Sequence, residues 1–578
     1  MADHRAVTGK ARGVARLSMW LDRRTGYSTL VKLIVDEPIP GGARWWYVFG
    51  AILTFLLGSQ FLTGVLLSTA YAPSASTAWA STVFIQDTLP LGWFIRGLHS
   101  FGSSAMLVLA GIHLFQVLIF GAYKAPREIT WLAGLAMLGL LLAFALTGYA
   151  LPWDEKGYWA KQVETGIVGT IPLVGPLAQR LLQGGASYGN YTVTTFCAIH
   201  TALLPSLIVV LLVLHILLVR KHGVTPRWGI DEAALARRTE TYWPHQASRD
   251  TTACGLVFVV LGLIVIKTHG ADLEGPVDPS GSFLARPDWY ALPLYQLRRY
   301  FEGSLELIGT LVIPGIGALV LAGLPWLDSA EGRDPRRRKT VMAGAMAGLL
   351  GLGVLSYLPL RHDRADPSFK KARAEAGDRA RRARQLARDG VPPEGGMAVF
   401  RNDPRFHSRE LWNEHCANCH SFTGEGGKEA PDLKGYNGRA WIEGFLRDPQ
   451  GRLFMGTANL EKGMKPVLGT KEELHALTEL VYAQTGAADA DRSLVIAAES
   501  LFSQKDCDSC HDRDGTGQNT GPNLRGRGTL PYLVDVITDA GDARLFGKRN
   551  KMPSFANKLS PEEIGELAQF VLLESSSP

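Results

Sequence analysis

Four histidines lie inside apolar stretches of the sequence and form two spaced pairs. They are His99 and His113 in GLHSFGSSAMLVLAGIHLFQ, and His200 and His215 in FCAIHTALLPSLIVVLLVLHILL. Separations of 14 and 15 residues return a side chain to nearly the same helix face, about 40 to 60° away and roughly 21 to 22 Å further along. Two such helices side by side could clamp two iron porphyrins, with one imidazole from each helix on each iron.

A simpler interpretation is that these are buried histidines whose ring nitrogens are satisfied by neighbouring groups. An ionisable side chain in hydrocarbon is costly, however, and is usually kept for a function. Four histidines in two matched pairs therefore favour two haem b groups, one held by His99 and His200 and the other by His113 and His215.

Two further sites have the form Cys-x-x-Cys-His. In this pentad two thioether bonds attach a haem c, and the histidine is one axial ligand of its iron. A disulfide or a zinc knuckle would not explain a histidine directly after each second cysteine. The residues concerned are Cys416, Cys419 and His420 at the first site, and Cys507, Cys510 and His511 at the second.

The elements that must position the four intramembrane histidines are long apolar segments. The chain has 578 residues, 46% of them hydrophobic, which indicates a membrane protein. Seven apolar segments can be drawn, at about 45–70, 93–120, 130–150, 197–219, 252–268, 305–327 and 340–360. Residues 1–44 are basic and polar, so the first of these segments is expected to target the chain.

Basic residues indicate the orientation. They gather in the N-terminal segment and in the loops after the second, fourth and sixth spans, which belong on the cytoplasmic side by the positive-inside rule. An odd number of spans then delivers everything after residue 360 to the other face, where haem c is attached in bacteria. We therefore expect a multi-pass protein of the bacterial inner membrane with a cytoplasmic N-terminus and a periplasmic C-terminal part. His99 and His200 would lie near the outer face.

The polar C-terminal part is an internal repeat with an offset of 91 residues, since Cys416 corresponds to Cys507 and Pro431 to Pro522. Each repeat is expected to be a small helical domain with a methionine as sixth ligand about 40 residues after its histidine. These methionines are Met464 for the first haem c, with Met455 as the alternative, and Met552 for the second. Simple core packing is the other interpretation of each methionine.

The predicted fold class is all-α, a transmembrane bundle of about seven helices followed by two tandem small cytochrome c domains. The expected parts are a basic segment (1–44), a four-helix dihaem domain (45–245), a three-helix domain (246–360), a charged linker (361–394), and two cytochrome c domains (395–488 and 489–578). The linker is rich in Ala and Arg with charges all round, which favours a solvated helical spacer, with contact to acidic lipid heads as the alternative.

Residues 30–360 resemble the cytochrome b of quinol:cytochrome c reductases, the cytochrome bc and b6f complexes. The 15-residue spacing of His200 and His215 is similar to the b6f type, in which the segment after about residue 245 is usually a separate subunit. The chain thus looks like a fusion of both parts with a dihaem cytochrome c. The motifs that carry the resemblance are Gln60–Gly64, Arg96–His99, Pro126–Glu128, Thr147–Tyr149, Pro152–Asp154, Gly157–Ala160, Arg220–Gly223 and Pro287–Tyr290.

The resemblance implies two quinone sites. Asp288 would be the base that takes a proton from quinol near the outer face, beside Trp289 and Tyr290, although Asp288 could also be a helix N-cap. Pro152 and Trp153 would form the rim of that pocket. Arg220 and Lys221 would lie near a quinone at the inner face, where their charge favours its reduction.

The resemblance also bears on the haem groups. An arginine common in the family before the third histidine ligand is replaced here by Thr195, so Arg96 would balance more of the haem propionate charge. Family members with an extra covalent haem in the membrane half use a cysteine where this chain has Val48, so no such haem is expected.

The implied activity is proton-translocating quinol oxidation. One electron would go through a partner Rieske iron-sulfur protein to the fused c haems, and the other through the two b haems to the inner quinone. Other expected partners are a downstream cytochrome c or oxidase, the lipid bilayer and a second copy of the chain in a larger complex, but no nucleic acid. The competing hypotheses are a non-catalytic electron conduit and a haem-binding membrane anchor.

Overall fold

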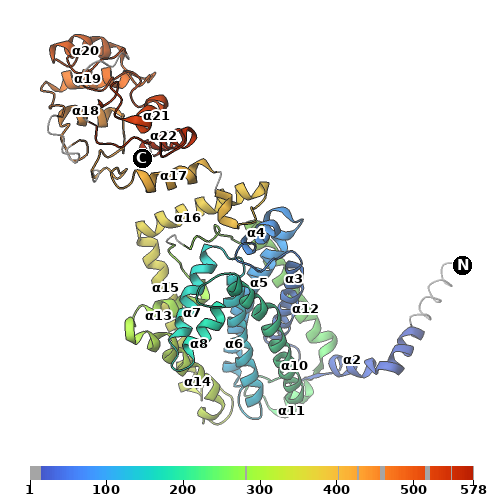
Figure 1. The fold of residues 1–578 in the computed structure, drawn as a ribbon. Helices are drawn as coiled ribbons and strands as arrows, with labels where there is room; N and C mark the ends of the chain where they lie inside the picture. The colour runs from blue at the N-terminus through green and yellow to red at the C-terminus, as the bar shows by residue number, and fades with distance from the viewer. Residues whose placement is uncertain are drawn as a thin grey trace. The chain divides into compact units, whose positions relative to one another are not determined.

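The computed structural model describes residues 15–279, 283–400, 403–425, 429–455, 463–514, 521–547 and 550–576, which are mostly helical (Figure 1). The first fourteen residues of the predicted basic segment lie outside this set. The chain divides into two compact units, Met1–Val399 and Phe400–Pro578. Within the described residues, the strands form a single short antiparallel pair, β1 (Pro38–Ile39) with β2 (Glu240–Thr241). The all-α prediction is confirmed.

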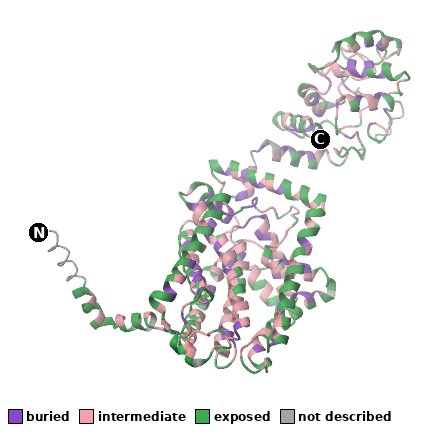
Figure 2. Cartoon of the chain, turned by 180° about the vertical axis from the view of Figure 1, so that it is seen from behind, coloured by how far each residue is buried: buried purple, intermediate pink, exposed green. Residues whose placement is uncertain are grey.

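Seven helical segments of the first unit are long and apolar enough to cross a membrane. They carry large exposed apolar side chains, such as Leu62 and Val210, as expected for surfaces that contact lipid. Figure 2 shows exposed residues in green along the helices. The fourth segment begins at residue 190 and the fifth at residue 242, both earlier than predicted. The segments are η1–α3 (Trp45–Ser68), α5 (Gly92–Phe120), α6 (Glu128–Ala150), α9–η3–α10 (Asn190–His222), η4–α12 (Tyr242–Thr268), η7–α14 (Ile308–Leu327) and α15 (Lys339–Ala365).

The four intramembrane histidines lie on α5 and on the η3–α10 segment. Helix α5 packs against α3, and α10 packs against α6, so each histidine-bearing helix has an apolar neighbour. Helix α5 ends at Gly121, which adopts a left-handed conformation (φ 60°) and donates its N–H to the carbonyls of Leu118 and Val117. His99 lies near the beginning of α5 and His113 near its end. The two ends of the bundle are therefore called the His99 end and the His113 end.

Short elements cover both ends of the bundle. Those at the His99 end are α4 (Ala78–Val83), η2 (Phe84–Thr88), α7 (Glu155–Gly169), α8 (Gly175–Gln183), η5 (Trp289–Ala291), α13 (Leu292–Arg298) and η6 (Gly303–Leu305). Those at the His113 end are α2 (Tyr27–Val35) and α11 (Glu232–Arg237), together with the β1–β2 pair. Most of the polar side chains discussed below belong to these connections rather than to the spans.

Helix α16 (Pro367–Leu386) occupies most of the segment predicted to be a solvated helical spacer; the segment is helical and mostly exposed, but one face of it is buried. Three alanines, at 376, 380 and 383, recur every three or four residues and are buried against the bundle. Three arginines of α16 form ion pairs with acids on three separate connections: Arg373 with Glu274, Arg379 with Glu155, and Arg384 with Asp87. The helix thus lies across the His99 end (Figure 1) and ties these connections together.

The described residues of the second unit contain six α-helices. The helices are α17 (Pro404–His415), α18 (Arg439–Arg447), α19 (Lys471–Ala483), α20 (Arg492–Gln504), α21 (Leu530–Asp539) and α22 (Pro561–Ser575). The repeat is visible in the helix caps, since Thr470 with Glu473 and Ser560 with Glu563 form equivalent capping boxes.

Two hydrophobic cores fill the second unit, but they do not follow the predicted boundary at residue 488. Core A combines buried residues of α17, the first Cys-x-x-Cys-His segment, α21 and α22. Core B combines buried residues of α18, α19 and α20, together with Leu524. Each core therefore takes helices from both repeats, which differs from two consecutive domains at 395–488 and 489–578.

The ion pairs of α16 make a testable prediction. In Arg379→Glu a negative charge faces Glu155, which is buried and already has its pKa raised by burial to about 7. We expect amide exchange across residues 367–386 to become roughly tenfold faster or more, because a buried charge loses its partner. Hydrogen–deuterium exchange of the intact protein measures this rate.

Two control variants define the outcome. Adding Glu155→Arg to Arg379→Glu restores opposite charges and should recover slow exchange. Arg381→Glu changes an exposed residue of the same helix that pairs with Asp378 one turn away, so it should have little effect. Equal acceleration in Arg381→Glu and Arg379→Glu would contradict a specific ion-pair clamp.

Candidate functional site

The structure brings the rings of His99 of α5 and His200 of η3 close together. Their ring centroids are 6.2 Å apart and the ring planes differ by 69°. A metal–imidazole bond is about 2.0 Å long, and a further ~1.1 Å separates a ring nitrogen from the ring centroid. An iron bound by both rings therefore needs a centroid separation of about 6 Å, which this pair provides.

Two threonines determine which ring nitrogen of this pair is available. The Nδ1 atoms of His99 and His200 lie 2.9 Å and 3.0 Å from the hydroxyls of Thr63 and Thr147. Each hydroxyl donates its own proton to a helix carbonyl one turn earlier, of Ser59 or Ala143, so it accepts the imidazole Nδ1–H. Each Nε2 therefore keeps the lone pair that a metal requires.

A glycine follows each of these threonines and makes room for the imidazole. A Cβ atom at Gly148 would lie 2.7 Å from Cε1 of His200, and one at Gly64 would lie 3.3 Å from Cε1 of His99. Both Thr-Gly pairs belong to motifs quoted from the sequence, but no role was predicted for them. The signal that could have found them is the repetition of Thr-Gly in two spans that flank the histidine helices.

The second histidine pair lines a cavity of about 610 Å³ inside the bundle. His113 Nδ1 lies 3.0 Å from the Gln116 side-chain oxygen, and His215 Nδ1 lies 3.1 Å from the carbonyl oxygen of Thr130. Both contacts again occupy Nδ1 and leave Nε2 available. Gly134 lies against His215, where a Cβ atom would approach Cε1 to 3.4 Å.

The same cavity has a polar wall at the His113 end. Arg220 forms an ion pair there with Glu37, and Asp250 accepts hydrogen bonds from the Tyr242 hydroxyl (3.1 Å) and the Gln246 amide (2.8 Å). Lys221, predicted beside Arg220 as a second cation, is exposed and does not line the cavity. The acidic residues of this wall were missed because they lie on other segments of the chain.

At the His99 end, Asp288 forms an ion pair with Lys156 of α7, with 2.8 Å between Oδ1 and Nζ. The ammonium of Lys156 lies 4.9 Å from the ring centroid of Tyr149, whose buried hydroxyl has no partner among the described residues. Asp288 occupies the N-cap position of η5, but its side chain makes no capping bond. Beside it, Trp289 and Tyr290 contact each other edge to face.

Trp153 was expected at the rim of the same pocket, and the structure places it differently. Its side chain is 2% exposed and packs with Ala78, Tyr158 and Val193 in a small core, while its backbone adopts a left-handed conformation (φ 49°). The neighbouring Asp154 caps α7 and accepts the N–H of Glu274 at 3.1 Å. The segment from Pro152 therefore positions α7, and through it Lys156.

Arg96 uses its guanidinium to hold connections at the His99 end. It donates to the Gln86 side chain and to the carbonyls of Ala271 and Asp272, at 2.7 to 2.8 Å. Another cation, Lys161, was not predicted from the sequence. Lys161 of α7 is fully buried, pairs with Glu164, and has its ammonium 5.0 Å from the Phe196 ring.

The two histidines of the Cys-x-x-Cys-His segments have equivalent surroundings. His420 Nδ1 donates to the Pro431 carbonyl (2.9 Å), and His511 Nδ1 donates to the Pro522 carbonyl (2.8 Å). Burial lowers the pKa of both imidazoles, which favours the neutral form that binds a metal.

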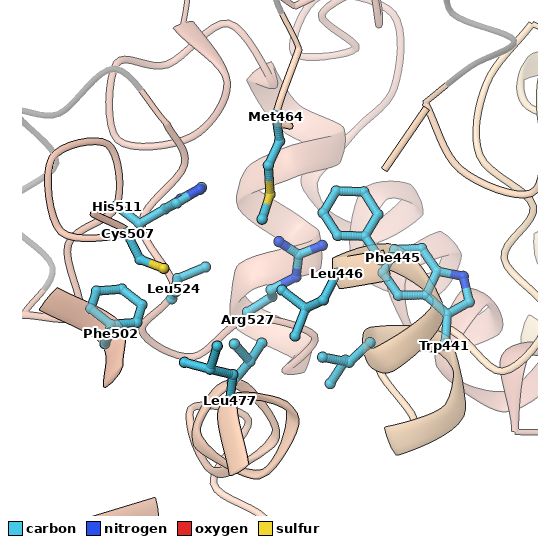
Figure 3. A pocket seen from close by; sticks show the side chains of 12 residues that line it. Trp441, Phe445, Leu446, Met464, Leu477, Phe502, Cys507, His511, Leu524 and Arg527 are labelled. Atoms are coloured by element: carbon cyan, nitrogen blue, oxygen red, sulfur yellow. The ribbon is translucent and has the colours of Figure 1, made fainter. Parts of the chain in front are cut away.

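The methionines are not arranged as the repeat predicted. Met464 of the first repeat lines one pocket with Cys507 and His511 of the second (Figure 3). Met552 of the second repeat packs against core A, which contains Cys416 of the first. Met455, the alternative to Met464, does not line the pocket in Figure 3.

Three family models match the sequence. They are "Cytochrome b/b6/petB" over residues 34–223, "Cytochrome b(C-terminal)/b6/petD" over residues 284–364, and "Cytochrome C oxidase, cbb3-type, subunit III" over residues 495–571. The first two cover most of the seven-helix unit, and the third covers most of the second repeat, including its Cys-x-x-Cys-His segment.

Cytochrome b of Rhodobacter capsulatus is 32% identical over 345 residues, which span 55% of this chain and 78% of the relative. The chain belongs to the cytochrome b family. Cytochrome b6 of Mastigocladus laminosus is 35% identical over 212 residues, spanning 37% of this chain and 99% of that protein. Cytochrome b/c1 of Bradyrhizobium diazoefficiens is 32% identical over 326 residues, spanning 55% of this chain and 47% of that protein.

A solved structure titled "Hyperthermophilic respiratory Complex III" shares the fold, with a TM-score of 0.50 and 22% identity over 61% of this chain and 93% of that chain. The resemblance to cytochrome b read from the motifs is confirmed. The chain is a multi-pass membrane protein, and its cytochrome b and cytochrome c parts imply haem b and haem c.

The hydrogen bond between Thr147 and His200 makes a testable prediction. Thr147→Val keeps the shape of the side chain but removes the acceptor for Nδ1–H, so His200 loses its fixed orientation. We expect affinity for the haem at this pair to fall about 10- to 100-fold. The haem b content of the purified protein and the redox titration of its b-type absorbance measure this loss.

Thr252→Val is the matched control, because Thr252 lies exposed in the fifth span, donates to the Ser248 carbonyl of its own helix and does not line the histidine cavity. The haem b content should stay at the wild-type level in this variant. An unchanged content and redox titration in Thr147→Val would contradict the orienting role of the threonine.

Proposed function

We propose that the chain is the membrane core of a proton-translocating quinol:cytochrome c oxidoreductase. The observation that carries the proposal is the combination of two histidine pairs in one bundle, one in ring contact and one lining a shared cavity, with a polar site at each end. One pair alone would serve a simple haem protein. Two pairs along one bundle give a path for electrons between the two ends, and the polar sites give each end a place where protons can be exchanged.

Four haem groups belong to this proposal. His99 with His200 and His113 with His215 would each hold a haem b, and the two Cys-x-x-Cys-His segments would each attach a haem c. When bound, these groups supply one-electron carriers. The protein contributes the neutral imidazoles, the Nδ1 acceptors that orient them, and the apolar helices that exclude water.

Asp288 is proposed to take the proton released when quinol is oxidised at the His99 end. Its carboxylate forms an ion pair with Lys156, and a carboxylate is a base that can accept this proton. The unpartnered hydroxyl of Tyr149 offers a hydrogen bond to a substrate in the same region. By the distribution of basic loops, this end faces the periplasm, so the proton would leave on that side.

The polar wall at the His113 end is proposed to bind the quinone that is reduced. The Glu37–Arg220 pair and Asp250 line the cavity that also contains His113 and His215. Arg220 can stabilise negative charge on a quinone oxygen, while Glu37 and Asp250 can deliver protons taken from the cytoplasmic side. Release at one end and uptake at the other couple electron flow to a proton gradient.

The remaining steps require partners. A Rieske iron-sulfur protein is proposed to take the first electron of each quinol to the c haems of the second unit, and a cytochrome c or an oxidase to receive it from there. A homodimer within a larger complex in the bacterial inner membrane is part of the same proposal.

Asp288→Asn tests the proposed quinol site. The variant keeps the size of the side chain and removes the proton acceptor, so quinol-driven reduction of the c haems should slow about 100-fold or more. The measurement is stopped-flow reduction of the intact complex by a quinol analogue. Spectra of all haems after dithionite should be unchanged, because Asp288 does not contact a histidine ligand.

Asp378→Asn is the control, since Asp378 lies exposed on α16 at the same end and pairs only with Arg381. It should react like the wild type. If Asp288→Asn also reacts at the wild-type rate and resists inhibitors of the outer quinol site, the chain is a passive electron conduit and the proposal fails.

A further inference from the structure

The repeat in the second unit predicts that each haem c is enclosed by one contiguous repeat. The helices of this unit instead pack against helices of the other repeat. Helix α17, from the first repeat, packs against α22, the last helix of the second. Trp412 and Phe422 of the first repeat contact the ring of Phe570 at centroid distances of 6.0 and 6.2 Å. His407 and Arg409 also pair with Glu566 and Glu574 of α22.

The reciprocal contact is present in core B. Helix α20, which precedes the second Cys-x-x-Cys-His segment, packs against α19, the last helix of the first repeat. Ala498 and Phe502 of α20 lie in one core with Leu477 and Leu480 of α19. Each amino-terminal helix is therefore paired with the closing helix of the other repeat.

The chain crosses between the cores at equivalent positions of the two repeats. Gly435 donates its N–H to the Ser575 carbonyl, and Gly526 donates its N–H to the Gln484 carbonyl, both at 2.9 Å. Gly526 lies 91 residues after Gly435, and Ser575 lies 91 residues after Gln484, so the two contacts are related by the repeat. If the two repeats exchange helices, the chain must pass from one core to the other at equivalent positions of both repeats.

The two crossing segments also touch each other. Both begin with a glycine in the left-handed conformation, Gly435 (φ 70°) and Gly526 (φ 68°). A Cβ atom at Gly528 would lie 1.5 Å from the side-chain nitrogen of Asn437, and Arg527 donates to the Asn437 side-chain oxygen at 3.3 Å. Only a glycine at 528 permits this contact, so the crossing is built into the sequence.

The candidate ligand side chains are also brought together across the two repeats. Figure 3 shows the His511 ring directed toward the Met464 side chain, with Cys507 beside it and Arg527 at the base of the pocket. Met552 packs on core A, where Cys416 is buried and Trp412 contacts the His420 ring at 6.2 Å. Each histidine thus shares its core with the methionine of the other repeat.

We propose that the two haem c irons are ligated across the repeats, His511 with Met464 and His420 with Met552. This inference rests on the proposed attachment of haem c to both Cys-x-x-Cys-His segments. The consequence is an interlocked dihaem unit: neither repeat can complete a haem site without the other, so both haems form only when the whole unit is folded.

Variants with a single haem c separate this assignment from ligation within a repeat. Cys416→Ser with Cys419→Ser leaves only the haem at Cys507 and Cys510 in the full-length protein. In that background Met464→Ala should abolish the far-red methionine-to-iron charge-transfer band of the oxidised haem, and Met552→Ala should leave it. With Cys507→Ser and Cys510→Ser the two methionine variants should exchange their effects.

The opposite pattern in both backgrounds would overturn the inference and restore ligation within each repeat. Absence of covalent haem from the wild-type chain, seen by haem staining after denaturing electrophoresis, would instead refute the attachment itself and so the proposed function of the second unit. The two failures are therefore distinguishable.

A second measurement keeps both haems and avoids variants that fail to fold. A protease site inserted between Ala487 and Ala488 allows the connection between the repeats to be cut in the intact membrane protein. Interlocked repeats should stay together after cleavage, so that the second haem c remains with the membranes until denaturant is added. Release of a soluble one-haem fragment without denaturant would contradict the exchange.

Discussion

The membrane half depends on one constraint: an imidazole inside an apolar bundle needs an acceptor for its Nδ1–H. Thr63 and Thr147 provide hydroxyls that are already donating to helix carbonyls, and the Thr130 carbonyl and the Gln116 side chain serve the other two rings. With Nδ1 satisfied, each ring directs an unprotonated Nε2 away from its support. The tautomer of each ring follows from this constraint, and the glycines beside three of the rings leave room for the orientation that it requires.

The chemistry at the ends of the bundle depends on ion pairs between distant segments. Asp288 is paired with Lys156, and Glu37 is paired with Arg220, so each acid has an opposite charge beside it next to an apolar bundle. Helix α16 extends the same principle, because its arginines bind acids on three connections at the His99 end. Ion pairs thus hold the connections together, while apolar packing holds the spans together.

Sequence periodicity predicted the features that repeat along one helix, namely the histidine pairs and the seven spans. It could not predict features that join segments far apart in the chain. The partner of Asp288 lies 132 residues away. The buried face of α16 consists only of alanines, and among so many charged residues these alanines do not stand out in the sequence as an apolar face. The repeat showed two homologous halves, but which half closes which core depends on the paired crossings near Asn437 and Gly528, and these carry no periodic signal.

The central claim is that the membrane half holds two haem groups without covalent bonds, between paired imidazoles. Quantifying haem in the purified chain before and after extraction with acidified acetone tests it most directly. The account predicts two haem groups per chain in the extract and two that remain attached to the protein. An extract free of haem, with every porphyrin retained on the polypeptide, would contradict it.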